Sequence, residues 1–240
     1  MDWHGKVALV TGARRGLGRA CVEALTAAGA QVAAHERTGG EFAADLADPA
    51  APAALIARVL RGFGRLDYLI NNAAFTPLVP AEAHDWEATP GFDPGQDLER
   101  FNRTLAVNLR APLQLALAAA AQAPALAAIV NVGSGSAARG DGSSAEFVLS
   151  KGAIPTLTQY LARRLAPGVR VNAFVPGLFD TEEIAGRGPA FVSRRQAILE
   201  RTPMARLGAP AEAAETILFL LAGNAFITGQ CLFLDGGLHL

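Results

Sequence analysis

The chain has 240 residues, 51% of them apolar, and its 21 Lys and Arg against 22 Asp and Glu give a formal net charge of -1. That length suits one α/β domain with a substantial core, and the balanced charge gives no general reason to expect nucleic acid or an anionic membrane as a partner. Cys21 and Cys231 show no metal-ligand or redox spacing, and the N-terminus runs into strand-like sequence without a targeting segment, so we expect a reduced, cytoplasmic protein.

Predicted strands and helices alternate almost to the end of the chain. In the first half, strands at 6–12, 31–36 and 66–73 are each followed by a helix, at 16–29, 50–62 and 98–122. In the second half, strands at 127–134 and 169–177 are followed by helices at 145–165 and 211–221, and a last strand lies at 230–237. Apolar strands separated by amphipathic helices indicate an α/β fold with a Rossmann-type, doubly wound parallel sheet covered on both faces. No repeat or linker marks a second domain, so we expect a single domain over 1–240.

One stretch from Ala111 to Ala138 carries no charged side chain and is long enough to raise the question of a membrane span. Pro124 divides it into an Ala/Leu helix and a short strand. We therefore predict a buried helix followed by a central strand.

Two segments interrupt the alternation, at about 75–97 and 178–208. Both follow the ends of predicted strands, where ligands bind in open α/β sheets. We expect them to form the walls and lid of a substrate site.

The glycine-rich segment Thr11–Gly18 lies between the first strand and the first helix. Glycine there lets the backbone turn tightly and approach a pyrophosphate, which then meets the unpaired N–H groups of the helix N-terminus. The position in the first βα unit favours dinucleotide binding.

Four further patterns accompany this segment: Asn71-Asn72-Ala73-Ala74, Asn108 in VNLRAP, Ser134 with Phe147 and Lys151, and Pro176-Gly177 followed by Thr181. Together with the ending FITGQCLFLDGG, they resemble the classical short-chain dehydrogenase/reductase family over nearly the whole chain. The resemblance implies a nicotinamide cofactor held by Gly12, Arg14, Arg15, Gly16, Leu17, Gly18, Glu36, Arg37, Asp45, Leu46, Asn72, Ala73, Ala74, Lys151, Pro176, Gly177, Phe179 and Thr181.

The charges near the expected adenine ribose decide between the two dinucleotides. Arg14, Arg15 and Arg37 could clamp a 2′-phosphate, whereas Glu36 sits where an acid would bind the 2′-hydroxyl of NAD. Three cations against one carboxylate favour NADP(H), with NAD(H) as the alternative. The connection from Arg37 to Asp45 has no room for a full helix, which leaves the position of Arg37 open.

The resemblance also assigns catalytic roles. In the family a tyrosine donates a proton, a serine orients the substrate oxygen, a lysine holds the ribose and lowers the pKa of the tyrosine, and an asparagine supports a water relay. Ser134, Phe147, Lys151 and Asn108 occupy those positions, but Phe147 has no hydroxyl and can neither give nor take a proton.

Three accounts of Phe147 are open. In the first, the chain is an engineered tyrosine variant. In the second, it uses another donor, among Ser136, Ser143, Ser144, Asp141 and Glu146, or reduces an iminium that needs little protonation. In the third, it is a catalytically silent, nucleotide-binding regulator or scaffold.

We predict an NADP(H)-dependent oxidoreductase that reduces a small carbonyl or imine-type substrate, and a homo-oligomer, dimer or tetramer, built through the helices at 98–122 and 145–165. His35 is expected near the cofactor, and His84 with Trp86 in the first substrate segment. The histidines are too scattered to indicate a metal site.

Overall fold

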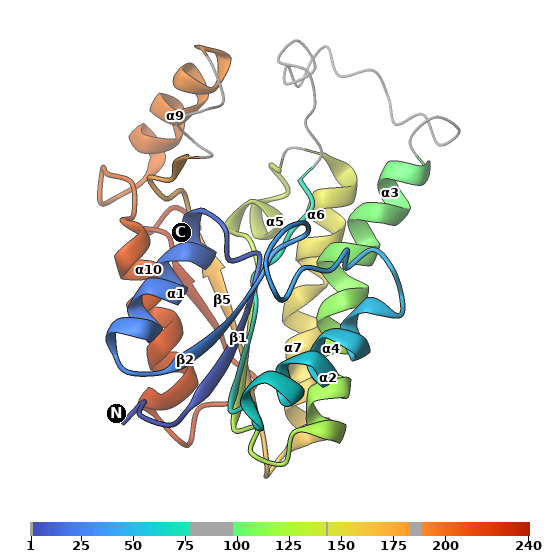
Figure 1. Ribbon diagram of the computed structural model, residues 1–240. Helices are drawn as coiled ribbons and strands as arrows, with labels where there is room; N and C mark the ends of the chain where they lie inside the picture. Colours follow the sequence, from blue (N-terminus) through green and yellow to red (C-terminus); the bar gives the residue numbers. More distant parts are fainter. Residues whose placement is uncertain (1, 77–97, 143, 183–188) are drawn as a thin grey trace.

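Six parallel strands form one sheet. The computed structural model describes residues 2–76, 98–142, 144–182 and 189–240. The strands are β1 (Val7–Thr11), β2 (Gln31–His35), β3 (Tyr68–Asn71), β4 (Ala128–Val132), β5 (Arg170–Pro176) and β6 (Cys231–Leu234), in the spatial order β2-β1-β3-β4-β5-β6 (Figure 1). Because every neighbouring pair is parallel, all six carboxyl ends lie at the same edge. The predicted doubly wound fold is confirmed.

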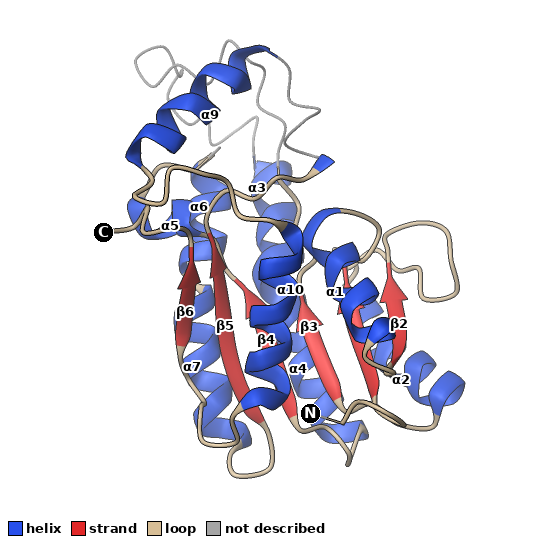
Figure 2. Ribbon diagram, turned by 90° about the vertical axis from the view of Figure 1, so that its left-hand side faces the viewer, coloured by secondary structure: helices blue, strands red, loops and turns tan. Residues whose placement is uncertain are grey.

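Helices cover both faces of this sheet (Figure 2). One face carries α1 (Gly16–Ala27) and α10 (Pro210–Leu218), and the other carries α2 (Ala51–Phe63), α4 (Ala111–Gln122) and α7 (Ile154–Leu165). The short helix α5 (Gly135–Arg139) and α9 (Pro189–Arg201) lie beyond the carboxyl ends of the strands.

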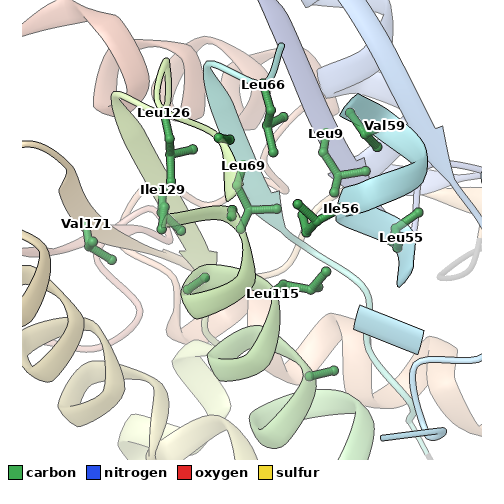
Figure 3. Packing of buried hydrophobic residues seen from close by; sticks show 14 of the residues in the cluster. Leu9, Leu55, Ile56, Val59, Leu66, Leu69, Leu115, Leu126, Ile129 and Val171 are labelled. Carbon is green, nitrogen blue, oxygen red and sulfur yellow. The ribbon is translucent and has the colours of Figure 1, made fainter. Parts of the chain in front are cut away.

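Alternating side chains of each strand enter two separate cores. In β1, Val7 and Leu9 pack with α2 and α4, while Ala8 and Val10 pack with α1 and α10. Figure 3 shows the first core, in which Leu9 lies among residues of neighbouring strands and helices. This alternation follows from the period of two along a strand, and it fixes which residues reach the carboxyl edge.

The long helix predicted over 98–122 is present and contains one irregular turn. It consists of α3 (Leu98–Leu105), a π-helical turn η2 (Ala106–Arg110) and α4. Within the described residues this is the one helix long and apolar enough to span a membrane. However, Ala111, Leu115, Ala116 and Ala119 are at most 1% exposed against the sheet, so it is a core helix.

The structure differs from the sequence prediction in three places. The helix expected over 145–165 is two helices, α6 (Ala145–Gly152) and α7, because Pro155 in the first turn of α7 has no N–H to continue the ladder. The segment 178–208, which interrupts the predicted alternation of strands and helices, contains the 13-residue helix α9. Helix α10 continues into a second π-helical turn, η3 (Phe219–Gly223).

Candidate functional site

Three glycines shape the turn after β1. Gly12 and Gly16 have φ angles of +67° and +55°, in the left-handed region that favours glycine. A Cβ on Gly18 would lie 2.1 Å from the carbonyl oxygen of Gly12, and one on Gly12 would lie 2.8 Å from the Cα of Ala73. The turn, α1 and the end of β3 therefore approach so closely that no side chain fits between them.

The N-terminus of α1 already receives an anionic group. Helix α1 has no side-chain cap and no acidic residue in its first turn. The carboxylate of Glu182 accepts a hydrogen bond from the N–H of Gly16 at 3.4 Å, and its other oxygen lies 2.6 Å from Arg19 Nη2. A carboxylate in this place shows that the turn suits an oxyanion, and the residues present therefore fit the pyrophosphate of a dinucleotide.

His35 connects this turn to the segment after β2. Its ring is buried, its Nδ1 lies 3.3 Å from the backbone nitrogen of Gly12, and its Nε2 lies 3.0 Å from the carbonyl oxygen of Ala44. A carbonyl only accepts and an amide N–H only donates, so the imidazole is neutral with its proton on Nε2. Burial lowers the pKa of His35, which agrees with this neutral form.

Charged groups surround the expected adenine side. Arg14, Arg15 and Arg37 are exposed, while Glu36 lies half-buried with its carboxylate against Gly40. No helix occurs between Glu36 and Ala50, in agreement with the short connection read from the sequence.

Two residues expected at the adenine have other contacts in the structure. Asp45 accepts a hydrogen bond from Arg103 at 2.8 Å and another from the N–H of Ala47 at 3.0 Å. Leu46 is 3% exposed and belongs to the core below. Any contact of Leu46 with adenine would therefore come from its backbone.

The asparagines at the end of β3 brace the sheet. Asn71 donates to Oδ1 of Asn131 at 2.9 Å, in the neighbouring strand. The side chain of Asn72 donates to the carbonyl oxygens of Thr11 and Gly12, at 2.9 and 3.0 Å. Asn72 thus holds the glycine-rich turn in place, while Ala73 donates its N–H to the Thr11 hydroxyl and Ala74 is exposed.

Ser134 and Phe147 lie at the N-terminal ends of two successive short helices, α5 and α6 (Ala145–Gly152). Ser134 is the N-cap of α5, and its hydroxyl oxygen is 2.7 Å from that of Ser136. Phe147 lies in the first turn of α6, and its ring edge and the Ser136 hydroxyl are each 3.4 Å from the point where a Cβ of Gly142 would lie. The Ser136 hydroxyl and the aromatic ring therefore border the same glycine, and Ser134 contacts Ser136 just beyond the carboxyl end of β4.

Lys151, one helical turn after Phe147, is 4% exposed, and its ammonium donates to the carbonyl oxygen of Val132 at 2.7 Å. Burial lowers its pKa to about 8. An ammonium has three N–H groups, and this is the one hydrogen bond that the described residues give it. The Lys151 ammonium therefore has N–H groups that can donate to a polar ligand at the end of β4.

Asn108 lies in the π-helical turn and is fully buried. It accepts from the N–H of Phe75 at 2.7 Å, and it donates to the carbonyl of Phe75 at 3.1 Å and to the Ser150 hydroxyl at 3.0 Å. Ser150 in turn donates to the carbonyl oxygen of Phe147 at 2.9 Å. A π turn commonly marks a functional position in a helix, and here it joins α6 to the segment after β3.

The expected nicotinamide side follows β5. A Cβ on Gly177 would lie 2.6 Å from Asp235, so glycine is required there, and Phe179 is 5% exposed against Gly208. The methyl group of Thr181 lies 3.6 Å from the Cβ position of Gly16. The segment after β5 thus reaches back to the glycine-rich turn.

Some features were not predicted from the sequence. The contact of Glu182 with Gly16 joins residues 166 positions apart, and no local pattern signals it. The ion pair between Arg100 and Glu146, 2.6 Å, likewise joins separate helices. Of the predicted residues, His84, Trp86 and Ser143 lie outside the described residues, as does most of the segment 75–97. In the described ranges no three His, Cys, Asp or Glu side chains gather as metal ligands.

Comparison with known proteins agrees with this geometry. Residues 12–239 match the profile of the family described as enoyl-(acyl carrier protein) reductase. The chain is 30% identical to the 3-oxoacyl-[acyl-carrier-protein] reductase FabG of Escherichia coli, with all of both chains covered, and 35% identical to L-xylulose reductase of Bos taurus, with 97% and 96% covered. A short-chain dehydrogenase of Burkholderia cenocepacia, solved in complex with NADP, is 30% identical with a TM-score of 0.83 and full coverage of both chains. The protein belongs to the short-chain dehydrogenase/reductase family.

Proposed function

We propose that this protein is an NADP(H)-dependent oxidoreductase that transfers a hydride to a small carbonyl compound, with imine-type compounds as the second substrate class. The observation that carries the proposal is the buried ammonium of Lys151, which donates to the carbonyl of Val132 at the end of β4, two residues before Ser134, and which lies one helical turn beyond Phe147. Burying a cation is costly unless a ligand uses it, and a ribose with its hydroxyl groups is such a ligand.

The charge distribution supports NADP(H) over NAD(H). Arg14, Arg15 and Arg37 are exposed at the expected 2′-phosphate end, and the Glu36 carboxylate lies against Gly40. The related Burkholderia structure holds NADP. The guanidinium groups suit phosphate oxygens, because they offer several donors in one plane.

In this proposal the bound nicotinamide supplies the hydride, and the protein supplies position and protons. The glycine-rich turn and α1 bind the pyrophosphate, Lys151 binds the ribose, and Ser134 orients the oxygen of the substrate. Asn108 keeps α6 in register with the segment after β3, so that Phe147 and Lys151 face the same space. Phe147 closes that space with an apolar ring and contributes no proton.

The substrate range follows from this missing hydroxyl. A carbonyl oxygen must gain a proton as the carbon is reduced, and loss of a general acid costs about 10²–10⁴-fold in rate. An iminium ion is already positively charged, so its reduction needs less protonation by the protein. Substrates that are activated in this way should therefore be reduced faster than simple ketones.

The test is oxidation of NADPH with ethyl acetoacetate, 2,3-butanedione and 1-pyrroline, for the Phe147 protein and for Phe147→Tyr. We expect measurable turnover with Phe147 and a rise of at least about 10²-fold on ethyl acetoacetate in the Phe147→Tyr variant. The same large rise in rate is expected if Phe147 is an engineered replacement of a native tyrosine. Nucleotide binding without turnover in either form would instead identify a silent regulator or scaffold, and would overturn the proposal.

We also place the active protein in the cytoplasm as a homo-oligomer. The helices at 98–122 and 145–165 expose Leu117, Leu149 and Tyr160, at 42%, 58% and 56%. Apolar side chains on neighbouring helix faces favour association with a second copy. Sedimentation equilibrium distinguishes dimer, tetramer and monomer.

A further inference from the structure

We propose that Ser136 is a proton-relay residue that, through Ser134, takes the place of the absent tyrosine hydroxyl. This inference rests on the proposed function. It starts from the 2.7 Å distance between the two hydroxyl oxygens, which is the usual length of an O–H···O hydrogen bond.

Ser136 and Phe147 both border Gly142. The Ser136 hydroxyl and the Cδ1 atom of Phe147 are each 3.4 Å from the position that a Cβ of Gly142 would take, and Val148 lies nearer, at 2.5 Å. Ser136 is half-buried, in contrast to the fully buried Asn108. It can therefore exchange its proton with water while it touches Ser134.

The two acidic candidates near Phe147 are committed to ion pairs. The Glu146 side chain is 2% exposed and pairs with Arg100 at 2.6 Å. Asp141 accepts from Arg139 through both oxygens, at 2.9 and 3.0 Å. A carboxylate whose oxygens accept charge-assisted hydrogen bonds from a guanidinium is held there as an acceptor and is not positioned to donate to a substrate.

The remaining hydroxyl candidate has a structural task. Ser144 is the N-cap of α6 and accepts a hydrogen bond from the N–H of Phe147 at 3.3 Å. Ser143 lies outside the described residues. Of the described donor candidates, Ser136 is the one whose hydroxyl contacts the serine that orients the substrate.

The proton moves along three oxygens. As the hydride reaches the carbonyl carbon, the π-electron pair of the C=O bond moves to oxygen, which takes the proton of the Ser134 hydroxyl. Ser134 takes the proton of Ser136, and Ser136 takes one from a solvent water. Each turnover consumes one solvent proton, which is the proton that the tyrosine would otherwise supply.

The decisive experiment combines Ser136→Ala with Phe147→Tyr. In the Phe147 protein we expect Ser136→Ala to lower kcat for ethyl acetoacetate by about 10²-fold, and Ser136→Thr, which keeps a hydroxyl, to retain most of the rate. In the Phe147→Tyr background, Ser136→Ala should change kcat less than about 3-fold, because the relay is bypassed. NADPH affinity, measured by fluorescence titration, should be the same in all forms.

Ser144→Ala is the matched control. It removes a hydroxyl from the same segment and weakens a helix cap, so the melting temperature should fall while kcat is kept. An equal loss from Ser136→Ala in the Phe147 protein and in the Phe147→Tyr background would overturn the relay, as would no loss in either. If no form oxidises NADPH, the proposed function fails; if the Phe147 protein turns over and Ser136→Ala leaves it unchanged, the relay alone fails.

Discussion

The imidazole of His35 accepts a hydrogen bond from the backbone N–H of Gly12, and this contact fixes the glycine-rich turn to the end of β2. The same ring donates to Ala44 and so also holds the segment that leads to Asp45. The bond from Gly12 requires the neutral ring, since a protonated Nδ1 cannot accept, whereas the bond to Ala44 is kept in either form.

Acidification should therefore weaken nucleotide binding. Burial lowers the pKa of His35, helped by the nearby charge of Arg58 and opposed by Ala44 and Glu36. Since the folded protein binds this proton less readily than the unfolded chain, its stability falls as the pH drops below about 6.5. The Kd of NADPH, titrated from pH 8 to pH 5.5, should rise several-fold with His35 and change less with His35→Gln. His4→Gln, at an exposed histidine, should behave like the unaltered protein.

Glu182 should compete with the nucleotide. Its carboxylate accepts from Gly16 and pairs with Arg19, at the place proposed for the pyrophosphate. Glu182→Gln removes the negative charge, so we expect the Kd of NADPH to fall about 3-fold or more, an effect of the size typical for one charge at a helix N-terminus. Glu23→Gln is the control, because Glu23 also pairs with Arg19 but lies about two turns further along α1. Unchanged affinity in Glu182→Gln would show that the contact does not compete.

The buried ammonium of Lys151 should lower the free energy of unfolding. Its pKa is lowered to about 8 by burial, so the unfolded chain holds this proton more tightly and stability rises with pH from about 8 to about 10.5. Lys151→Met should abolish that rise and stabilise the nucleotide-free protein by about 1–3 kcal/mol at neutral pH. It should also weaken NADPH binding at least about 10-fold. Urea unfolding at pH 7 and pH 9.5, together with NADPH titration, measures both effects.

Gly18→Ala should destroy the nucleotide site. Its Cβ would overlap the carbonyl oxygen of Gly12 at 2.1 Å, so the turn must open. In Gly62→Ala the new Cβ meets Glu41 and Phe42 at an ordinary 3.7 Å, within helix α2. We expect loss of NADPH binding in the first variant, and a gain of about 0.8–1 kcal/mol with unchanged binding in the second. Calorimetric melting temperatures measured with and without NADPH distinguish the loss of binding from the change in stability.

The sequence predicted the sheet and most helices because their signals are local. Apolar runs and glycine turns mark β1, the glycine-rich turn and the helix from Leu98 to Gln122 at the positions where the structure has them. The spacing of Ser134, Phe147 and Lys151 also placed these residues at one edge. By contrast, the five-residue helix α5 and the break at Ala153 are too short for a periodic pattern.

Contacts between distant segments were not predictable in this way. Nothing near Glu182 in the chain points to Gly16, and nothing near Arg100 points to Glu146. The tautomer of His35 was equally hidden, because it depends on two backbone groups in different loops. These contacts depend on how elements meet in space, which a single sequence does not reveal.

The π-helical turn at Ala106–Arg110 lets the helix from Leu98 to Gln122 hold one residue more than a regular α-helix with the same facing at its two ends. Because π-helical hydrogen bonds run from i to i+5 instead of i to i+4, a π turn takes about one residue more than an α turn for nearly the same rotation. A chain one residue shorter here would therefore regain regular α-helical hydrogen bonding and leave α3 facing almost as it does now, with Arg100 near Glu146 and Arg103 near Asp45. It would lose the widened turn that holds Asn108 against Phe75 and Ser150, so such a deletion should be tolerated by the core and felt at the proposed site.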